Sequence, residues 1–388
     1  MFSQRTQKLQ RPIYRAIRDY AVGLGIKDGI YLNLGEPDFP TPPHIVEAGK
    51  TALNQNFTHY SDDRGFPDLR DAVAENLRQT RRVEVEGGRG VVITDGSTEA
   101  NMSVLLTLVD AGDEVIVSDP GYPPYTQAIR IAGATPVYAP LDMETLQWDL
   151  EQLKSKITSK TKVIIVNSPH NPTGGVYSRE LLKAIMDLAQ DNDLFVLADE
   201  TYDAFLYGES FNTITEFDKN LERTVVTNSF SKTFAMTGWR VGYVATSEKL
   251  ITELVKVKGI LNMCSPAFCQ KAAISALKGP RDPLLAMLKE YSERRKIVLD
   301  SLSHIQVFCP EPKGAFYAFP DISNFSPDSL EFTKFLVREA HVVVSPGIAF
   351  GQGGEGHVRI SYASSKKDLS MAFERIGKAV EKLPPAKP

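Results

Sequence analysis

The sequence predicts an α/β protein with a mostly parallel β-sheet lying between helices, and three observations support this. Between residues 45 and 276, short apolar runs alternate with longer segments of helical period, as in sheets whose strands are joined by helical crossovers. The chain has 388 residues, too many for one small core, because a domain averages about 150 residues. After about residue 283 the alternation ends, which predicts a second, smaller α+β unit.

Six strands are expected in the larger unit. Most of them are rich in Val, Ile or Leu and end in polar residues, as buried parallel strands do. Between them lie helical patterns with apolar residues three or four positions apart, such as Leu69, Val73 and Leu77. The expected strands span residues 91–94, 114–118, 162–167, 194–199, 224–228 and 241–246.

The smaller unit is expected to begin with a long charged helix that includes residues 291–297. Strands at 315–319, 342–345 and 357–362 follow in the prediction. Residues 351–356 satisfy the pattern G-x-G-x-x-G, but a dinucleotide-binding site requires a helix directly after it. Because a strand is expected there, we predict a flexible loop and not a nicotinamide-linked dehydrogenase.

The charge and cysteine content exclude several classes of protein. The chain has 44 Lys and Arg against 48 Asp and Glu, with no long block of one sign, so no nucleic-acid partner is expected. The first ten residues lack the apolar run of a signal peptide, and no stretch of about 18 apolar residues follows. The three cysteines lack the spacing of metal ligands. We expect a cytoplasmic protein with no membrane partner and no metal.

Polar clusters follow four of the expected strands at their carboxyl ends, where open parallel sheets bind ligands. The first, residues 95–98 (DGST), opens a helix whose free N–H groups and positive dipole end suit a phosphate; an ordinary N-cap is the alternative. The second, residues 168–174, is a turn rich in proline. It can aim the Asn171 amide at a ligand oxygen, or it can be a turn without function.

The other two clusters carry charges of opposite sign. Asp199 follows an apolar run of five residues, so its carboxylate requires a partner, either a cationic ring nitrogen or an ordinary salt bridge. Lys232 follows a strand in the segment 229–232 (SFSK), with Arg240 close behind. A lysine there can form a Schiff base if its amine is often unprotonated, whereas a solvated surface lysine is the alternative.

The segment SFSK with GWRVG at 238–242 resembles the pyridoxal 5'-phosphate (PLP) attachment signature of the class I/II aminotransferases, which have PLP-transferase fold type I. The similarity covers nearly the whole chain. Residues 33–39 (NLGEPDF) resemble the family's N-terminal substrate loop, 60–70 its Tyr…Gly…Leu-Arg segment and 359–361 its carboxylate-binding strand. The resemblance implies an aspartate aminotransferase-like fold with a seven-stranded type of sheet.

This resemblance also implies roles for individual residues. Lys232 would form the internal aldimine with PLP and then move the proton between the substrate Cα and the cofactor C4'. Asp199 would pair with the pyridine nitrogen, Tyr202 and Asn171 would hydrogen-bond the phenolic oxygen, and Tyr122 would stack on the ring. The phosphate would be held by Gly96, Ser97, Thr98, Ser229 and Arg240.

Assembly and closure follow from the same resemblance. Tyr60 would reach the phosphate in the neighbouring subunit, which implies a homodimer with shared active sites. Arg359 would clamp the substrate α-carboxylate, helped by Asn171 and the N–H of Gly35. Because Gly35 and Arg359 come from opposite ends of the chain, residues 1–44 and 283–388 are expected to form a small domain that closes over a large PLP-binding domain at 45–282.

The expected reaction moves the amino group of an L-amino acid to a 2-oxo acid, taken from the family to be 2-oxoglutarate, through a ping-pong pyridoxamine intermediate. A PLP-dependent lyase, decarboxylase, substitution enzyme or oxidase stays open as an alternative, because these enzymes share the cofactor residues. A non-catalytic binding protein of the same fold is the weaker alternative. Residues 256–264, expected near the substrate side chain, contain lysines but no arginine, which favours an aromatic or other neutral amino donor.

Overall fold

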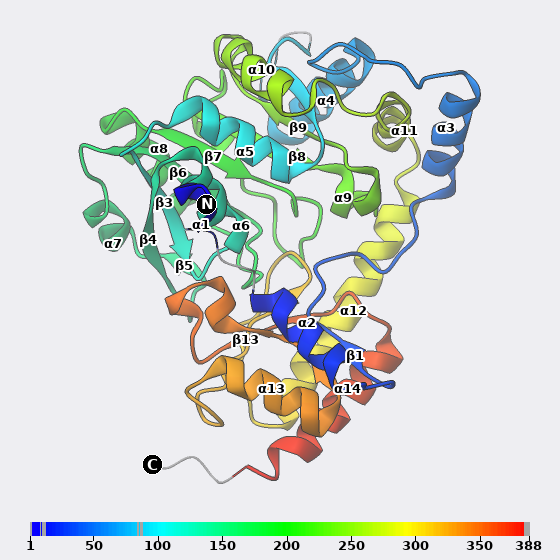
Figure 1. The fold of residues 1–388 in the computed structure, drawn as a ribbon, viewed down its shortest axis with the longest axis vertical. Coiled ribbons are helices and arrows are strands. Elements are labelled where there is room, and N and C mark those ends of the chain that lie inside the picture. Colours follow the sequence, from blue (N-terminus) through cyan, green and yellow to red (C-terminus); the bar gives the residue numbers. More distant parts are fainter. Residues whose placement is uncertain (1, 8, 10–12, 84, 86–87, 384–388) are drawn as a thin grey trace.

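The computed structural model describes residues 2–7, 9, 13–83, 85 and 88–383. A sheet of eight strands with its covering helices forms the larger part, and a smaller group of helices and short strands lies at one end of it (Figure 1). Helix α12 (Asp282–His304) runs from one part into the other. The helices around the large sheet are α3 (Pro43–Asn54), α4 (Pro67–Arg81), α5 (Ser97–Leu108), α6 (Pro123–Ala132), α7 (Leu150–Ser155), α8 (Arg179–Asp191), α9 (Phe230–Thr233), α10 (Glu248–Asn262) and α11 (Ala267–Lys278).

The large sheet is mostly parallel, as predicted. Its strand order is β2-β9-β8-β7-β6-β3-β4-β5, with β9 antiparallel to both of its neighbours and β5 antiparallel to β4. All six predicted strands are present, and their ends agree within one residue. The strands are β2 (Val91–Thr94), β3 (Glu114–Asp119), β4 (Thr135–Asp142), β5 (Gln147–Trp148), β6 (Thr161–Asn167), β7 (Phe195–Asp199), β8 (Thr224–Ser229) and β9 (Gly242–Ala245).

Two strands at one edge, β4 and β5, were not expected from the sequence. Strand β4 contains Pro136 and Pro140, and most of its side chains keep some exposure, so it lacks the continuous apolar run of a buried strand. Strand β5 has only two residues. Without β5 the sheet has seven strands, the number that the family resemblance implies.

Alternating side chains along the central strands fill both faces of the sheet. Val163 and Ile165 of β6 lie in a cluster with side chains of α5, α6 and α10, whereas Ile164 and Val166 lie in a cluster with α7 and α8. Helices α4 and α11 cover the region of β2 and β9. Burial on both faces explains why β6 and β7 each contain four consecutive apolar residues.

The two ends of the chain meet in the smaller part. Strand β1 pairs in parallel with β11, and β13 lies between β10 and β12 in an antiparallel sheet. Helices α12, α13 and α14 cover these strands in one apolar cluster. The further elements are α1 (Gln4–Gln7), α2 (Ile13–Gly23), β1 (Ile30–Tyr31), β10 (Tyr317–Ala318), α13 (Ser329–Ala340), β11 (Val342–Val343), β12 (Ser345–Pro346), β13 (Val358–Ser361) and α14 (Lys366–Val380).

The glycine-rich residues 351–356 belong to the smaller part and contact the end of β3 in the larger part. They form a short 3-10 turn at Gln352–Gly354, and strand β13 follows, so the helix that a dinucleotide motif requires is not formed. The Gly353 N–H donates to Asp119 Oδ1 at 2.9 Å, and the Gly121 N–H donates to the Phe350 carbonyl at 2.8 Å. These glycines permit a close contact beside the end of β3.

No helix within the described ranges is long and apolar enough to cross a membrane. In the same residues, no group of three or more His, Cys, Asp or Glu side chains is placed to hold a metal ion.

Candidate active site

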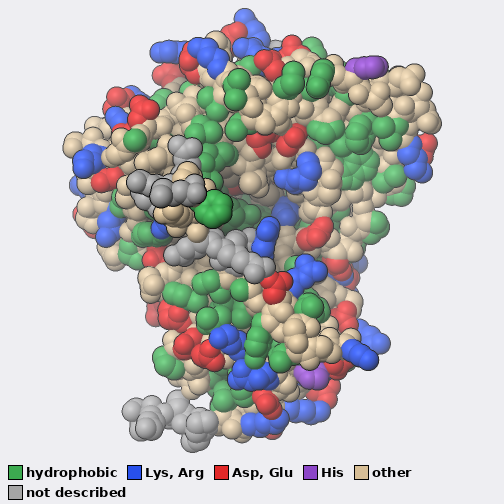
Figure 2. Space-filling view, in the orientation of Figure 1, with side chains coloured by type: hydrophobic (Ala, Val, Ile, Leu, Met, Phe, Trp, Pro, Cys, Tyr) green, Lys and Arg blue, Asp and Glu red, His purple; other side chains and the backbone are tan. Residues whose placement is uncertain are grey.

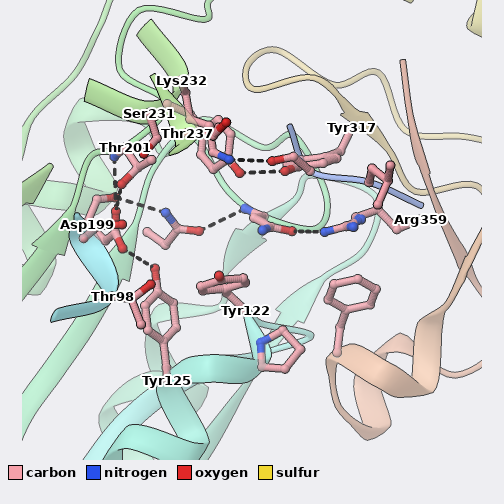
Figure 3. A pocket seen from close by; sticks show the side chains of 18 of the residues that line it. Thr98, Tyr122, Tyr125, Asp199, Thr201, Ser231, Lys232, Thr237, Tyr317 and Arg359 are labelled. Carbon is pink, nitrogen blue, oxygen red and sulfur yellow. Dashed lines mark hydrogen bonds between the residues drawn. The ribbon is translucent and has the colours of Figure 1, made fainter. Parts of the chain in front are cut away.

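The carboxyl ends of β6 and β7 and the segment after β8 border a cavity of about 350 Å³, which residues of the smaller part line on the opposite side. Figure 2 shows a hollow in the middle of this face, and Figure 3 shows the side chains inside it. The predicted residues that line the cavity are Gly35, Ser97, Thr98, Tyr122, Asn171, Asp199, Tyr202, Lys232, Arg240 and Arg359. Tyr60, Gly96 and Ser229 are not among its lining residues.

Lys232 reaches the cavity from α9, the single turn that follows β8. Ser229 caps this turn, and its Oγ accepts a hydrogen bond from the Ser231 N–H at 3.1 Å. The Lys232 Nζ donates to the Gly35 carbonyl oxygen on the opposite wall (Figure 3). The amine is therefore positioned between the two parts of the molecule and is not a solvated surface group.

The environment of Lys232 favours the neutral amine. Burial lowers the pKa of Lys232 to about 8, and the nearby cations Arg359 and Arg240 act in the same direction. The carboxylates of Glu36 and Asp199 oppose this shift. A fraction of the amine is consequently unprotonated near neutral pH, as a nucleophile or general base requires.

Asp199 ends β7 and is 3% exposed. Its Oδ2 accepts hydrogen bonds from Asn101 Nδ2 and Tyr125 OH, both at 2.9 Å. Its Oδ1 accepts from the Thr201 N–H at 3.1 Å and from Thr201 Oγ1 at 2.7 Å. No Lys or Arg within the described ranges forms a salt bridge with it, so no cation of those residues occupies the carboxylate. Four neutral donors fix a carboxylate that can face a cationic ligand atom.

The start of α5 and Arg240 form an anion-binding end of the cavity. Gly96 caps α5 with φ of 82°, and Ser97 and Thr98 are the first residues of the helix. Arg240 donates to the carbonyls of Asp95 and Thr237, both at 3.0 Å. A Cβ on Gly96 would lie 2.4 Å from the Arg240 guanidinium, so only glycine allows this contact. Free helical N–H groups beside a guanidinium suit a phosphate.

Ser231, which was not predicted, lines this cavity, whereas Ser229 lies behind it. Ser229 Oγ donates to Ser231 Oγ at 2.7 Å. The SFSK segment alone could not show which of its two serines faces the ligand, because that depends on how α9 begins.

A chain of three hydrogen bonds connects Asp199 with Arg359 across the cavity (Figure 3). Asn167 Nδ2 donates to the Asp199 carbonyl at 3.0 Å, and the Asn171 N–H donates to Asn167 Oδ1 at 2.9 Å. Arg359 Nη1 then donates to Asn171 Oδ1 at 2.9 Å. Asn167 was not predicted as a site residue, although it ends a predicted strand. Asn167 thus helps to fix the positions of Asp199 and Arg359, which have opposite charges, relative to each other.

Arg359 is held in one plane and uses two of its five N–H donors within the described chain. Its Nη2 donates to the Asn33 carbonyl at 2.8 Å, and its Nε is buried without a partner. The guanidinium carbon lies 4.5 Å from the ring centre of Tyr317 and 4.9 Å from that of Phe350. This arrangement suits a carboxylate bound to the N–H groups that Asn171 and Asn33 leave unused.

Aromatic residues complete the walls. Tyr122 lines the cavity and packs edge-on against Tyr125, with ring centres 5.3 Å apart. The hydroxyls of Tyr202 and Tyr317 are 2.6 Å apart. A Cβ on Gly35 would lie 2.5 Å from the Tyr317 hydroxyl, so glycine is required where this backbone approaches Lys232.

Residues 27–376 match the family model described as aminotransferase class I and II. The chain belongs to this family. The aspartate aminotransferase of Pyrococcus abyssi is 40% identical over 365 residues, which cover 93% of this chain and 94% of the relative. Aromatic-amino-acid aminotransferase 2 of Thermococcus litoralis is 39% identical over 361 residues, covering 92% and 93%. The solved aspartate aminotransferase from Thermus thermophilus with maleate has a TM-score of 0.93 and 34% identity, covering 98% and 99%.

These similarities establish a PLP-dependent aminotransferase, which moves an amino group from an amino acid to a 2-oxo acid. Other PLP chemistry and a non-catalytic role are thereby set aside. The cavity of the aminotransferase fits the cofactor: it offers Asp199 for a cationic ring nitrogen, the start of α5 with Arg240 for a phosphate, and the Lys232 amine for an aldehyde.

Proposed function

We propose that Lys232 of the aminotransferase both attaches PLP covalently and moves the proton of the reaction. Bound PLP supplies an electron-withdrawing ring that makes the substrate Cα–H acidic. The lowered pKa of Lys232 and the direction of its Nζ support its role in taking a proton from Cα and delivering it to the cofactor C4'. Asp199 would stabilise a protonated ring nitrogen with its fixed carboxylate.

The other residues would orient cofactor and substrate. Arg359, through the N–H groups of its Nη atoms that are not used within the protein, would bind the α-carboxylate together with Asn171 and the Gly35 N–H. Tyr122 would stack on the ring, and Asn171 and Tyr202 would contact the phenolic oxygen. The phosphate would be held by Gly96, Ser97, Thr98, Ser229 and Arg240, with Ser231 added by its position in the lining. We propose 2-oxoglutarate as the amino acceptor.

Replacement of Lys232 tests this assignment. Lys232→Ala should retain PLP without a covalent bond and should lose more than about 100-fold in turnover, as expected when a general base is removed. Added methylamine should restore part of the turnover of Lys232→Ala if the missing function is proton transfer. Lys232→Arg is the matched variant that keeps the positive charge. Unchanged turnover in Lys232→Ala would contradict the proposal.

We also propose a homodimer in which Tyr60 serves the partner's site. Tyr60 is 81% exposed, and Ile260 and Met263 at the end of α10 are 89% and 55% exposed. The Ser61 N–H contacts Cys264 Sγ at 3.4 Å, so the segment of Tyr60 adjoins the end of α10. An apolar surface beside an exposed tyrosine supports an interface between subunits.

Subunit mixing tests this arrangement. In a hybrid of Tyr60→Ala and Lys232→Ala subunits, one site would contain Lys232 from one chain and Tyr60 from the other. Mixing the two purified variants under exchange conditions should therefore yield more activity than either variant has alone. If the subunits are shown to have exchanged and the activity does not increase, Tyr60 does not act across the interface.

Residues 1–44 and 283–388 are proposed to close as a small domain over residues 45–282. The pairing of β1 with β11 and the placement of Gly35 and Arg359 in the same cavity support this division. Closure should reduce hydrogen exchange near the Gly353 contact with Asp119 when a dicarboxylate is added; unchanged exchange would contradict it. We propose a cytoplasmic location, which cell fractionation would test.

A further inference from the structure

Two arginines of α2 line the same cavity and have no part in the roles assigned above. Arg15 and Arg18 are three residues apart in α2, so they lie on one face of the helix. Ile17 and Ala21 on another face are each 1% exposed and pack with Val337 and Val343. The helix is thus anchored to the smaller part by its apolar face and presents its basic face to the cavity.

These two arginines give the cavity lining an excess of positive over negative side chains. Arg15, Arg18, Lys232, Arg240 and Arg359 line it, whereas Asp199 is the only acidic residue in the described lining. Arg240 is matched to the phosphate, Arg359 to the α-carboxylate and Asp199 to the ring nitrogen. Arg15 and Arg18 therefore remain as two positive charges without an assigned anion.

Neither arginine is occupied by a partner in the part of the chain that the structure describes. Among the residues that the structure describes, no hydrogen bond or ion pair is formed by Arg15 or Arg18. Two arginines elsewhere on the molecule are paired, Arg179 with Glu216 at 2.8 Å and Arg223 with Asp193 at 2.7 Å. Both guanidinium groups are free to bind an anionic ligand.

We propose that Arg15 and Arg18 bind the second carboxylate of dicarboxylic substrates, so that α2 selects for amino and 2-oxo acids with an acidic side chain. The inference rests on the proposed role of Arg359 as the α-carboxylate site. Substrate then lies between Arg359 and the basic face of α2, with one carboxylate at each end. Guanidinium groups suit this purpose because they bind carboxylates through two parallel hydrogen bonds.

The stretch 256–264 does not supply the missing cation. Lys258 is fully buried, and its Nζ donates to the carbonyls of Asp63 at 2.8 Å and Met263 at 3.0 Å. It is absent from the described lining of the cavity. The cations for a second carboxylate are instead those of α2, near the start of the chain.

The test compares binding of glutarate, which has two carboxylates, with binding of butyrate, which has one. Dissociation constants are measured by titration of the PLP-loaded enzyme and, separately, by inhibition. The variant Arg15→Gln/Arg18→Gln should bind glutarate at least about 100-fold more weakly, since charge-assisted hydrogen bonds are lost, while butyrate should change by less than about threefold. Arg18→Lys should be intermediate because it keeps the charge and loses the fork.

Arg179→Gln is the control for loss of a positive charge, because it removes an arginine from α8, away from the cavity. It should leave both constants unchanged. Equal weakening of glutarate and butyrate by the α2 variant would overturn the proposal in favour of long-range steering, and unchanged glutarate binding would overturn it outright. Substrate specificity provides the second readout: kcat/KM for aspartate or glutamate should fall and that for alanine or phenylalanine should not.

This design separates the inference from the proposed function. If the α2 variant still converts bound PLP to pyridoxamine 5'-phosphate with alanine but has lost no preference for glutamate, the second-carboxylate site is wrong and the proposed function stands. If Arg359→Lys leaves butyrate binding unchanged, the proposed α-carboxylate site itself is wrong and the inference falls with it.

Discussion

The ionisation of Lys232 leads to a quantitative prediction about how cofactor-free enzyme captures PLP. Only the neutral amine attacks an aldehyde, and burial lowers the pKa of Lys232 from 10.5 to about 8. At pH 7 the neutral fraction is then about 10%, against about 0.03% for an ordinary lysine. The lowered pKa therefore makes the reactive form about 300-fold more abundant at neutral pH.

The pH dependence follows from the same shift. The reactive amine is present above the folded-state pKa and is lost as the pH falls through it. The capture rate should rise from pH 6, bend near pH 8 and then level off, whereas a free lysine continues to gain neutral amine up to about pH 10.4. Stopped-flow absorbance after mixing with PLP measures this rate.

Two controls isolate Lys232 in this assay. Nα-acetyl-lysine amide, measured at each pH with the same PLP stock, cancels the ionisation of PLP itself. Borohydride reduction followed by peptide mass analysis identifies the lysine that reacted, and Lys232→Ala gives the background. A constant ratio of enzyme rate to model-compound rate from pH 6 to 10 would refute the reasoning, because Lys232 would then titrate like a free lysine.

Three further substitutions, and one control substitution, test the architecture of the site. Asn167→Ala removes both hydrogen bonds of that side chain, so we expect a loss of about 2–4 kcal/mol in unfolding free energy, measured by urea denaturation, and a weaker α-carboxylate site; a loss below about 0.5 kcal/mol would argue against the chain of hydrogen bonds. Arg359→Lys should raise KM for every amino acid, because all share the α-carboxylate; steady-state kinetics showing an effect on a single substrate would place Arg359 in the side-chain pocket. Gly351→Ala should destabilise the protein by about 1–3 kcal/mol, because φ is 122° and the new Cβ would lie 2.1 Å from Asp119 Oδ1. Gly259→Ala, in a helix with open space around it, should be neutral or stabilising by about 1 kcal/mol in the same urea denaturation experiments. Equal effects of the two glycine substitutions would contradict the close contact at Gly351.

Much of the site could be predicted because its residues lie at or just after the ends of buried strands in the sequence. Apolar runs mark β6 and β7, and two valines mark β8. The polar residues at or after the ends of these strands, Asn171, Asp199 and Lys232, line the cavity. The position of such residues along the chain is sufficient to predict that they meet in one site, because parallel strands bring their carboxyl ends to one edge of the sheet.

Residues whose positions depend on packing could not be found in this way. Arg15 and Arg18 lie on a short helix whose sequence has no ligand motif, and only the docking of α2 on α13 and β11 directs them to the cavity. Ser231 is distinguished from Ser229 only by the geometry of the α9 cap. Tyr317 belongs to a predicted strand, but its contacts with Gly35 and Arg359 arise between segments far apart in the sequence.

The most direct test of the account is a single half-reaction with PLP-loaded enzyme and one amino acid, without any 2-oxo acid. After acid release, chromatography quantifies PLP and pyridoxamine 5'-phosphate, and the 2-oxo acid product is measured in the same sample. We predict one pyridoxamine 5'-phosphate and one 2-oxo acid for each PLP consumed, with Lys232→Ala forming neither at a comparable rate. Unchanged PLP accompanied by release of carbon dioxide or ammonia, or by consumption of oxygen, would contradict transamination through Lys232.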